Sequence, residues 1–167
     1  MTTILSIDPA IKNLGIVKMQ FKLGVKVSDL DINLIDLCNG KKVKEVKFID
    51  IIENLLDNLN KIDITDVDVV LIENIPSMKN PSVKSISVAI FTYYAMKNKE
   101  VHFVSPSRKL TKEENKLTYK ERKKASIKKV IESLNEEEVK QINKYKKIDD
   151  ICDCISQAKA YLLHVAK

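Results

Sequence analysis

The sequence contains few of the residues from which disulfide frameworks and zinc sites are built. Its 167 residues include three cysteines, Cys38, Cys152 and Cys154, an odd number without paired C-x-x-C spacing. This pattern argues against a disulfide scaffold and against a zinc site, so we expect reduced, partly buried thiols. The two histidines, His102 and His164, lie far apart in the sequence with no partner at metal-ligand spacing, and we interpret both as structural.

Long apolar stretches are also missing. No hydrophobic run approaches the roughly 20 residues needed to span a bilayer. The N-terminus lacks the basic region and hydrophobic stretch of a signal peptide. We therefore expect an intracellular protein in a reducing compartment, without membrane contact. With 44% hydrophobic and 31% charged residues, the composition is ordinary for a globular protein, and we predict one domain over residues 1–167.

Positive charge is concentrated in one part of the chain. The net charge is +6, but residues 97–147 hold 16 Lys and Arg against 8 Glu, a net +8, which leaves −2 for the remainder. An acidic frame with a basic lobe suits an enzyme that acts on nucleic acid, because metal ligands and phosphate contacts then occupy separate places. The alternative is a lysine-rich helix face that is merely solvated.

Hydrophobic periodicity predicts a mixed α/β sheet, with three antiparallel strands followed by parallel strands that alternate with helices. Continuous apolar runs at 2–8 and 67–73 are typical of central strands covered on both faces. The expected strands are 2–8, 16–21, part of 25–38, 67–73 and 101–104; the expected helices are 43–59, 82–98, 119–134 and 149–166, with a polar helix or connection at 136–146. Helices should therefore cover both faces of the sheet.

Four carboxylates occupy positions where burial is costly unless a cation compensates them. Asp8 and Glu73 end two buried strands, and Asp150 and Asp153 lie one turn apart near the start of the last helix. Acids at neighbouring strand ends should meet, and acids three residues apart share a helix face. Hard cations such as Mg²⁺ and Mn²⁺ prefer oxygen ligands. In a basic protein, this combination predicts metal-dependent chemistry on phosphodiesters, with two metals that activate a water and stabilise the leaving oxygen.

Each carboxylate also has a simpler interpretation. Asp8 can be a turn residue and Glu73 can begin a loop, while Asp149 and Asp150 can cap the last helix. Because Asp149 also lies one turn from Asp153, spacing alone does not decide between Asp149 and Asp150 as the ligand. The occurrence of these acids together and in this order favours the metal site.

Two segments are candidates for contacts with phosphate. Lys123 and Lys124 lie in a lysine-rich helix, and if it passes the acids, one of them could stabilise charge on the scissile phosphate. Phosphate contacts remote from the chemistry are the alternative. Lys79, Asn80 and Ser82 follow the second acidic strand end and suit contacts with phosphate or sugar. An ordinary loop in which Ser82 caps the next helix is the alternative there.

These features resemble the RuvC-like Holliday junction resolvases of the RNase H-like superfamily, and most closely their poxvirus branch. The matching pieces are Ile7-Asp8-Pro9, Ile72-Glu73 followed by Lys79, Asn80 and Ser82, the Lys124-Ala125 helix, and Asp150-x-x-Asp153. They extend from residue 4 to about residue 162. The single motifs are weak, but their order and spacing are fairly specific.

The resemblance implies an RNase H-like fold with two Mg²⁺ ions in the active site, for which Mn²⁺ substitutes. The implied metal ligands are Asp8, Glu73, Asp150 and Asp153. The resemblance favours Asp150 over Asp149 as a ligand, and it places the catalytic lysine at Lys124 with Lys123 as the alternative.

A homodimer is also implied. A four-way junction is nearly two-fold symmetric and its resolution needs two opposed nicks, so two identical active sites suit it. The predicted helix at 82–98 is apolar nearly all round and is a candidate interface. A fully buried core helix is the alternative.

We therefore predict a Mg²⁺-dependent endonuclease that resolves four-way DNA junctions by paired symmetric nicks, leaves 5′-phosphate and 3′-hydroxyl ends, and needs no organic cofactor. Further backbone contacts are expected from Arg108, Lys109, Arg122 and Lys123. Three alternatives remain: an RNase H-like nuclease on RNA–DNA hybrids, a non-catalytic protein that binds junctions, and a structural protein whose acids are caps and turns. A viral origin, with work in the host cytoplasm, follows from the resemblance alone.

Overall fold

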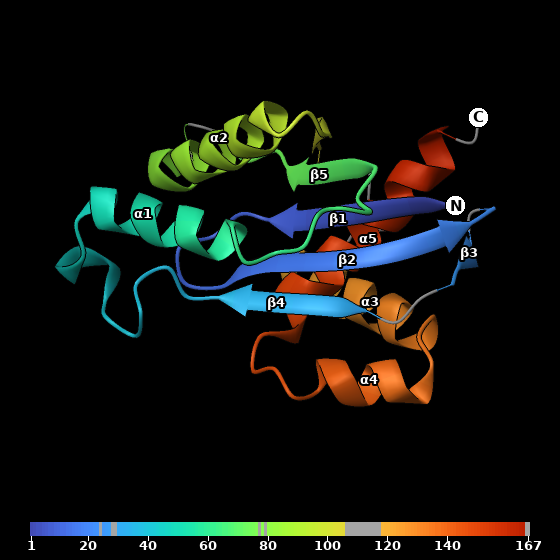
Figure 1. Cartoon of the computed structure of the whole chain (residues 1–167). Coiled ribbons are helices and arrows are strands. Elements are labelled where there is room, and N and C mark those ends of the chain that lie inside the picture. Colours follow the sequence, from blue (N-terminus) through green and yellow to red (C-terminus); the bar gives the residue numbers. More distant parts are fainter. Residues whose placement is uncertain (24, 28–29, 77, 79, 106–117, 166–167) are drawn as a thin grey trace.

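One mixed sheet forms the centre of the molecule, between two layers of helices (Figure 1). The computed structural model describes residues 1–23, 25–27, 30–76, 78, 80–105 and 118–165. The strands are β1 (Thr2–Asp8), β2 (Leu14–Lys22), β3 (Val25–Lys26), β4 (Asp31–Ile35), β5 (Val69–Glu73) and β6 (Glu100–Val104). Their order is β3-β2-β1-β5-β6, and β4 pairs separately with β2.

The strand directions follow the predicted division. β2 pairs antiparallel with β1, β3 and β4, whereas β1, β5 and β6 run parallel to one another. β1 and β5 are buried over most of their length because helices cover both faces, which explains their continuous apolar sequences. The mixed sheet is thus confirmed, although the predicted third strand consists of two pieces, β3 and β4.

The helices lie close to the predicted ranges. They are α1 (Phe48–Leu59), α2 (Pro81–Met96), α3 (Tyr119–Glu132), α4 (Glu136–Ile142) and α5 (Ile148–Val165), with a 3₁₀ turn at Val43–Glu45. α1 starts later than predicted because the 3₁₀ turn ends at Val46, an extended residue that separates it from the helix. α2 begins one residue early, since Pro81 occupies its first turn and Asn80, rather than Ser82, caps it.

Two hydrophobic cores lie on opposite faces of the sheet. One core joins α1 and α2 to the first face, through residues such as Leu55 and Ile90 against Leu5 and Val70. The other joins α3, α4 and α5 to the second face (Figure 1). Helices therefore cover both faces, as predicted, and the face that carries α5 is the one on which the candidate site lies.

α2 is not the fully buried helix that was one interpretation of its sequence. Ile86, Ile90 and Tyr94 are fully buried, whereas the opposite side exposes Val88 by 46% and Met96 by 80%. The helix thus buries one side against the sheet and leaves another apolar side open.

All three cysteines are buried and carry free thiols. Burial raises the pKa of the Cys152 thiol to about 12, and it also raises the pKa of Cys38. Both thiols are therefore poor nucleophiles at neutral pH. None of the helices in the described part of the chain has the length and apolar character needed to cross a bilayer.

Candidate active site

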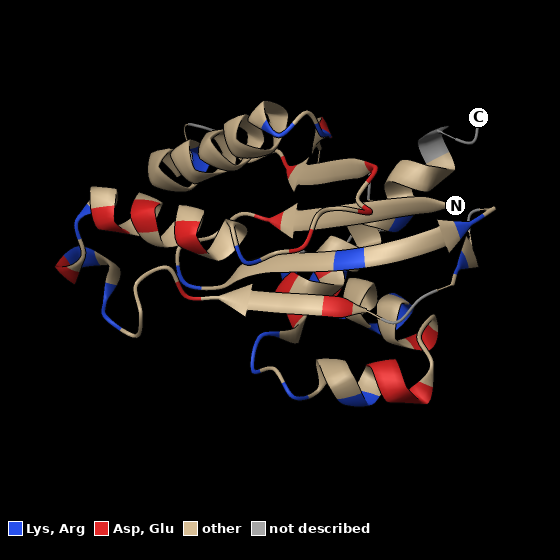
Figure 2. Ribbon diagram, viewed as in Figure 1, with Lys and Arg blue, Asp and Glu red and all other residues tan. Residues whose placement is uncertain are grey.

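The two acidic strand ends are neighbours in the sheet. β1 and β5 are parallel and pair Ile7 with Ile72, so Asp8 and Glu73 are the next residues along adjacent strands. Figure 2 shows the red ends of both strands pointing to the same side of the molecule. The sequence-based expectation that these two acids meet at one edge of the sheet is consistent with this register.

Alternation along the strands directs both acids to the same face. Ile7 and Ile72 belong to the core beneath α1 and α2. Because successive strand residues point to opposite faces, Asp8 and Glu73 face the side covered by α5. Both are half-buried.

Buried hydrogen bonds hold α5 against β1. The Ser6 hydroxyl donates to the carbonyl of Cys154 at 2.8 Å, and the Gln157 side-chain amide donates to the carbonyl of Ile7 at 3.4 Å. Ser6 and Gln157 are almost completely buried polar residues, and a buried polar group is stable only when it is hydrogen-bonded. These contacts fix the helix that carries Asp150 and Asp153 to the strand that carries Asp8.

Gly15 brings the start of α5 next to the strand ends. It pairs with Asp8 across β1 and β2. A Cβ atom at Gly15 would lie 3.2 Å from the carbonyl oxygen of Asp150 and 3.3 Å from Sγ of Cys154. The backbone of Asp150 therefore lies beside the residue opposite Asp8, and only the lack of a side chain at Gly15 permits this approach.

Replacing Gly15 by alanine should lower activity more than stability. The added methyl group must push the backbone of Asp150 by a few tenths of an ångström, and such a misplacement of a candidate catalytic residue costs more in rate than in folding. We expect Gly15→Ala to reduce the nuclease activity predicted from the sequence at least ~10-fold. The melting temperature should fall by only a few degrees, since a protein of this size loses about 2–4 °C for each kcal/mol of stability. Gly40→Ala is an unsuitable control because Gly40 has a positive φ of 84°; Asp57→Ala, on the exposed side of α1, is a better one. Unchanged cleavage by Gly15→Ala would contradict this account.

The acids at the start of α5 have different electrostatic environments. Burial raises the pKa of Asp150, and the neighbouring charges of Asp149 and Asp153 raise it further. Burial also raises the pKa of Asp149, but the hydrogen bond and the charge of Lys123 outweigh it and lower that pKa overall. The ion pair with Lys123 thus stabilises the charged form of Asp149, whereas burial above all disfavours the charged form of Asp150.

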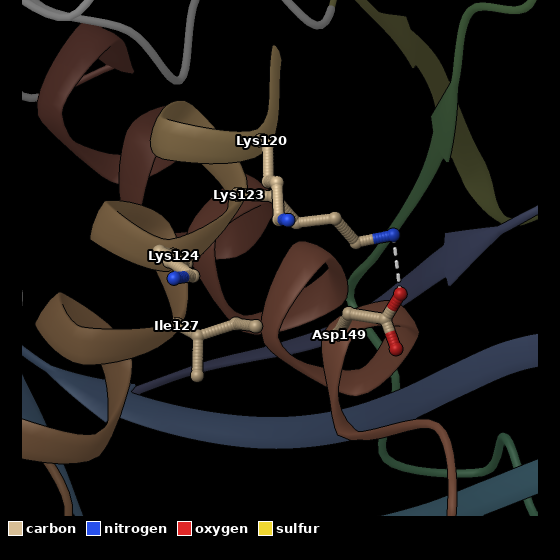
Figure 3. A pocket seen from close by; sticks show the side chains of 5 residues that line it. All are labelled: Lys120, Lys123, Lys124, Ile127 and Asp149. Carbon is tan, nitrogen blue, oxygen red and sulfur yellow. Dashed lines mark ion pairs between the residues drawn. The ribbon is translucent and has the colours of Figure 1, made fainter. Parts of the chain in front are cut away.

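Lys123 and Lys124 point in different directions. Both line an open pocket between α3 and the start of α5, together with Lys120, Ile127 and Asp149. Figure 3 shows the Lys123 amine reaching the Asp149 carboxylate, while the Lys124 side chain points away from it. Lys120, which the sequence did not single out, contributes to the same pocket because it lies one turn before Lys123 and Lys124.

The described carboxylates are not arranged as a complete metal-binding site. Among the residues that the structure describes, no three His, Cys, Asp or Glu side chains are arranged to hold a metal ion. The chemistry of the donors nevertheless fits a hard divalent cation, because half-buried carboxylates end two adjacent parallel strands, and because burial and neighbouring carboxylates raise the pKa of Asp150.

The structure places only some of the other residues predicted to contact DNA. Lys79, Arg108 and Lys109 lie outside the described residues. Asn80 is engaged as the cap of α2, where its side chain accepts a hydrogen bond from Val83 N–H at 3.2 Å, and Ser82 is exposed in the first turn of that helix. Arg122 is half-buried on α3, and its Nε has no hydrogen-bond acceptor among the described residues.

Lys84 is a cation that no motif in the sequence singles out. Its amine donates to the side chain of Asn74 at 3.0 Å and lies 4.6 Å from the centre of the Phe103 ring. Asn74 directly follows Glu73, so Lys84 is a cation beside an acidic strand end. Only the packing of α2 over β5 and β6 shows this proximity.

Comparison with known sequences gives the family. Residues 2–165 match the family described as Poxvirus A22 protein. The chain belongs to this family. A protein of Acanthamoeba polyphaga mimivirus is 29% identical over 137 residues. That match covers 65% of this chain but 33% of the mimivirus protein, so this A22 family member spans about a third of that relative's length.

Solved structures give the fold. The fowlpox virus Holliday junction resolvase is 21% identical, with a TM-score of 0.66 over 98% of this chain and 99% of its own. Fowlpox virus resolvase in complex with its substrate Holliday junction DNA is 22% identical, with a TM-score of 0.70 over 99% and 100%. RuvC of Thermus thermophilus, bound to a Holliday junction substrate, is 12% identical, with a TM-score of 0.61 over 99% and 96%. The A22 family protein thus has the RuvC-like, RNase H-like fold that the sequence predicted.

Proposed function

We propose that this protein is an endonuclease that resolves four-way DNA junctions by paired symmetric nicks, leaving 5′-phosphate and 3′-hydroxyl ends. The observation that carries the proposal is the position of Asp8 and Glu73 at adjacent strand ends, facing the helix that brings the backbone of Asp150 beside Gly15. This arrangement occurs in a fold shared with resolvases whose structures contain junction DNA. Residues 1–167 act in this proposal as one nuclease domain.

The proposed metal ligands are Asp8, Glu73, Asp150 and Asp153. These residues would hold two Mg²⁺ ions, or Mn²⁺ in their place. When bound, such ions activate a water and stabilise the leaving oxygen of a phosphodiester. Rigid elements carry these four carboxylates. Two of them end central strands, and two lie on a helix that buried hydrogen bonds tie to β1.

One lysine of α3 is proposed to contact the scissile phosphate. The resemblance to resolvases names Lys124, but the geometry favours Lys123, because its amine lies at the start of α5 and Lys124 is exposed. We expect Lys123→Ala to lower kcat about 10²-fold with little change in binding, and Lys124→Ala to lower it no more than ~3-fold. Single-turnover cleavage would measure both. A larger loss with Lys124→Ala would assign the role to Lys124, and no loss with either would move it to Lys120.

DNA binding is proposed to involve residues that follow β5 in the sequence and residues of the lysine-rich region at 97–147. Lys79, Asn80, Ser82, Arg108, Lys109 and Arg122 are the proposed contacts. Most protein–DNA hydrogen bonds go to phosphate and sugar, so specificity should come from the shape of the junction more than from base contacts.

A homodimer completes the proposal, because two opposed nicks need two sites. The apolar side of α2 that the sheet leaves open, with Val88 and Met96 exposed, supports an interface there. Sedimentation at micromolar concentration should give twice the monomer mass of 19.0 kDa. A monomeric mass under these conditions would contradict the dimer. Membership of the poxvirus A22 family also supports a location in the host cytoplasm.

The deciding experiment is nicking of a labelled four-way junction, beside a matched linear duplex and an RNA–DNA hybrid, with and without Mg²⁺. Symmetric, metal-dependent cuts confined to the junction are expected. Cleavage of the hybrid without preference for junctions would make the protein an RNase H-like nuclease instead. Tight binding at all Mg²⁺ and Mn²⁺ concentrations without any cut would leave a non-catalytic protein that binds junctions.

A further inference from the structure

A second basic surface lies outside the lysine-rich region at 97–147. It is the 41–47 segment, which forms the 3₁₀ turn before α1. Its lysines are Lys41, Lys42, Lys44 and Lys47. Glu45 is the one acid in the segment, so the net charge is +3 over seven residues. All four lysines are exposed.

Among the residues that the structure describes, no acidic side chain pairs with the lysines of this segment. Glu45 serves the turn, since its side chain accepts a hydrogen bond from the backbone N–H of Lys42 at 3.2 Å. The lysines therefore present a concentrated positive field to solvent.

Lys12 anchors the segment to the loop between β1 and β2. The Lys12 amine donates to the carbonyl of Lys41 at 2.7 Å and to the Asp36 carboxylate at 2.8 Å. The backbone N–H of Leu37 donates to the carbonyl of Ile11 at 2.9 Å. These bonds tie the residues just before β2 to the residues just after β4. The start of the 41–47 segment is therefore held in place.

The turn before the segment is ordered as well. Asp36 accepts hydrogen bonds from the backbone N–H groups of Cys38 and Gly40, each at 2.9 Å. Leu37 and Cys38 are buried in the core beneath α1 and α2, and the side-chain amide of Asn54 donates to the carbonyl of Leu37 at 2.9 Å. A surface that is already ordered loses little conformational entropy when it binds.

The anchor also places the segment near the candidate active site. Lys12 follows Asp8 by four residues, and four residues span at most roughly 14 Å. The Lys12 side chain then reaches Lys41 directly, so the segment begins well within one helical turn of B-DNA, ~34 Å, from Asp8. In Figure 2 the blue stretches before α1 lie on the side to which the red ends of β1 and β5 point.

We propose that the 41–47 segment is a phosphate-binding surface that holds a duplex arm of the DNA substrate beside the carboxylates. The inference rests on the proposed function and extends it. DNA carries one negative charge per ~1.7 Å of helix axis, so a duplex that leaves the site in this direction meets the lysines with several phosphates. The basic helix α3 lies on the opposite face of the sheet, and the protein would thus contact DNA on two sides of the site.

The test compares two variants with the same loss of charge. The first carries Lys42→Gln, Lys44→Gln and Lys47→Gln. The control carries Lys22→Gln, Lys61→Gln and Lys97→Gln, three exposed lysines at or near the opposite end of the strands. Fluorescence anisotropy measures the Kd for a labelled four-way junction in Ca²⁺, in place of Mg²⁺, at salt concentrations from about 50 to 200 mM. All six side chains are exposed, so their replacement should not disturb the core. Equal melting temperatures of the two variants and the unmodified protein would exclude a folding defect.

The first variant should bind at least ~10-fold more weakly, and the slope of log K against log salt should fall in magnitude by about 2 to 3, one unit for each lost phosphate contact. The control should stay within about 2-fold, since net charge alone changes equally in both variants. Equal behaviour of the two variants would overturn the inference while leaving the proposed function intact. Failure of the unmodified protein to bind the junction would overturn both.

Discussion

Glu73→Gln should abolish junction cleavage and leave junction binding intact. The substitution keeps the size of the side chain but replaces one carboxylate oxygen of a proposed metal ligand by an amide group, and it removes one negative charge at the end of β5. Loss of one preorganised electrostatic contact typically costs ~10²–10³-fold in rate, and loss of a metal ligand should cost at least that much. Binding should be retained or slightly tighter, because the change reduces repulsion of phosphate. Nicking in Mg²⁺ and binding in Ca²⁺ measure the two effects separately.

Glu53→Gln is the matched control for this experiment. Glu53 is exposed on α1, which covers the face of the sheet opposite to α5. The same chemical change should therefore leave the cleavage rate within about 2-fold, as is usual for surface substitutions. Full activity in Glu73→Gln would remove Glu73 from the metal site and the proposed mechanism with it.

Asp149→Asn and Asp150→Asn should have opposite effects on stability and very different effects on activity. The pKa of Asp150 is raised, so its charged form destabilises the fold at neutral pH, a cost that disappears as the pH falls below the unfolded-state pKa. The pKa of Asp149 is lowered, so its charge stabilises the fold above the unfolded-state pKa, and this contribution is lost as the pH falls through the folded-state value.

Asp150→Asn should therefore raise the melting temperature without metal at pH 7 by roughly 1–3 °C, after allowance for solvent screening, while cleavage falls at least ~10²-fold. Asp149→Asn should lower the melting temperature slightly, because it removes the partner of Lys123, and change cleavage by no more than ~3-fold. Thermal melts in EDTA and cleavage in Mg²⁺ provide the readouts. A severe loss with Asp149→Asn and a mild one with Asp150→Asn would move the ligand by one position.

The sequence was a sound guide wherever a single periodicity controls the structure. The continuous apolar runs of β1 and β5 identified central strands, because such strands are covered on both faces and have no polar side. The change from period two to period 3.6 located the helices to within a few residues, except that α1 begins five residues after the predicted start at residue 43. The boundary moved because the 3₁₀ turn and the extended Val46 interrupt the helix.

Net charge summed over a long stretch of sequence does not show a local cluster of lysines. Outside 97–147 the net charge is −2, and this sum hides the four lysines of the 41–47 segment. Net charge reports the total and not its distribution in space, whereas binding depends on how closely the charges lie together. The bonds of Lys12 to Asp36 and Lys41, which give that segment its position, join residues 24 and 29 positions apart, respectively.

By itself, the sequence determined the order of the strands and helices, the acids at the two central strand ends, and the family resemblance that their spacing carries. Local patterns suffice for these features because side-chain alternation and helical pitch are properties of the backbone. Only the tertiary structure showed that the Lys123 amine pairs with the Asp149 carboxylate and that the pKa values of Asp149 and Asp150 shift in opposite directions, since adjacent residues on a helix differ in direction rather than in composition. Which residue faces the strand ends depends on how α5 packs on β1, and that packing depends on contacts such as Ser6 with Cys154, 148 residues apart.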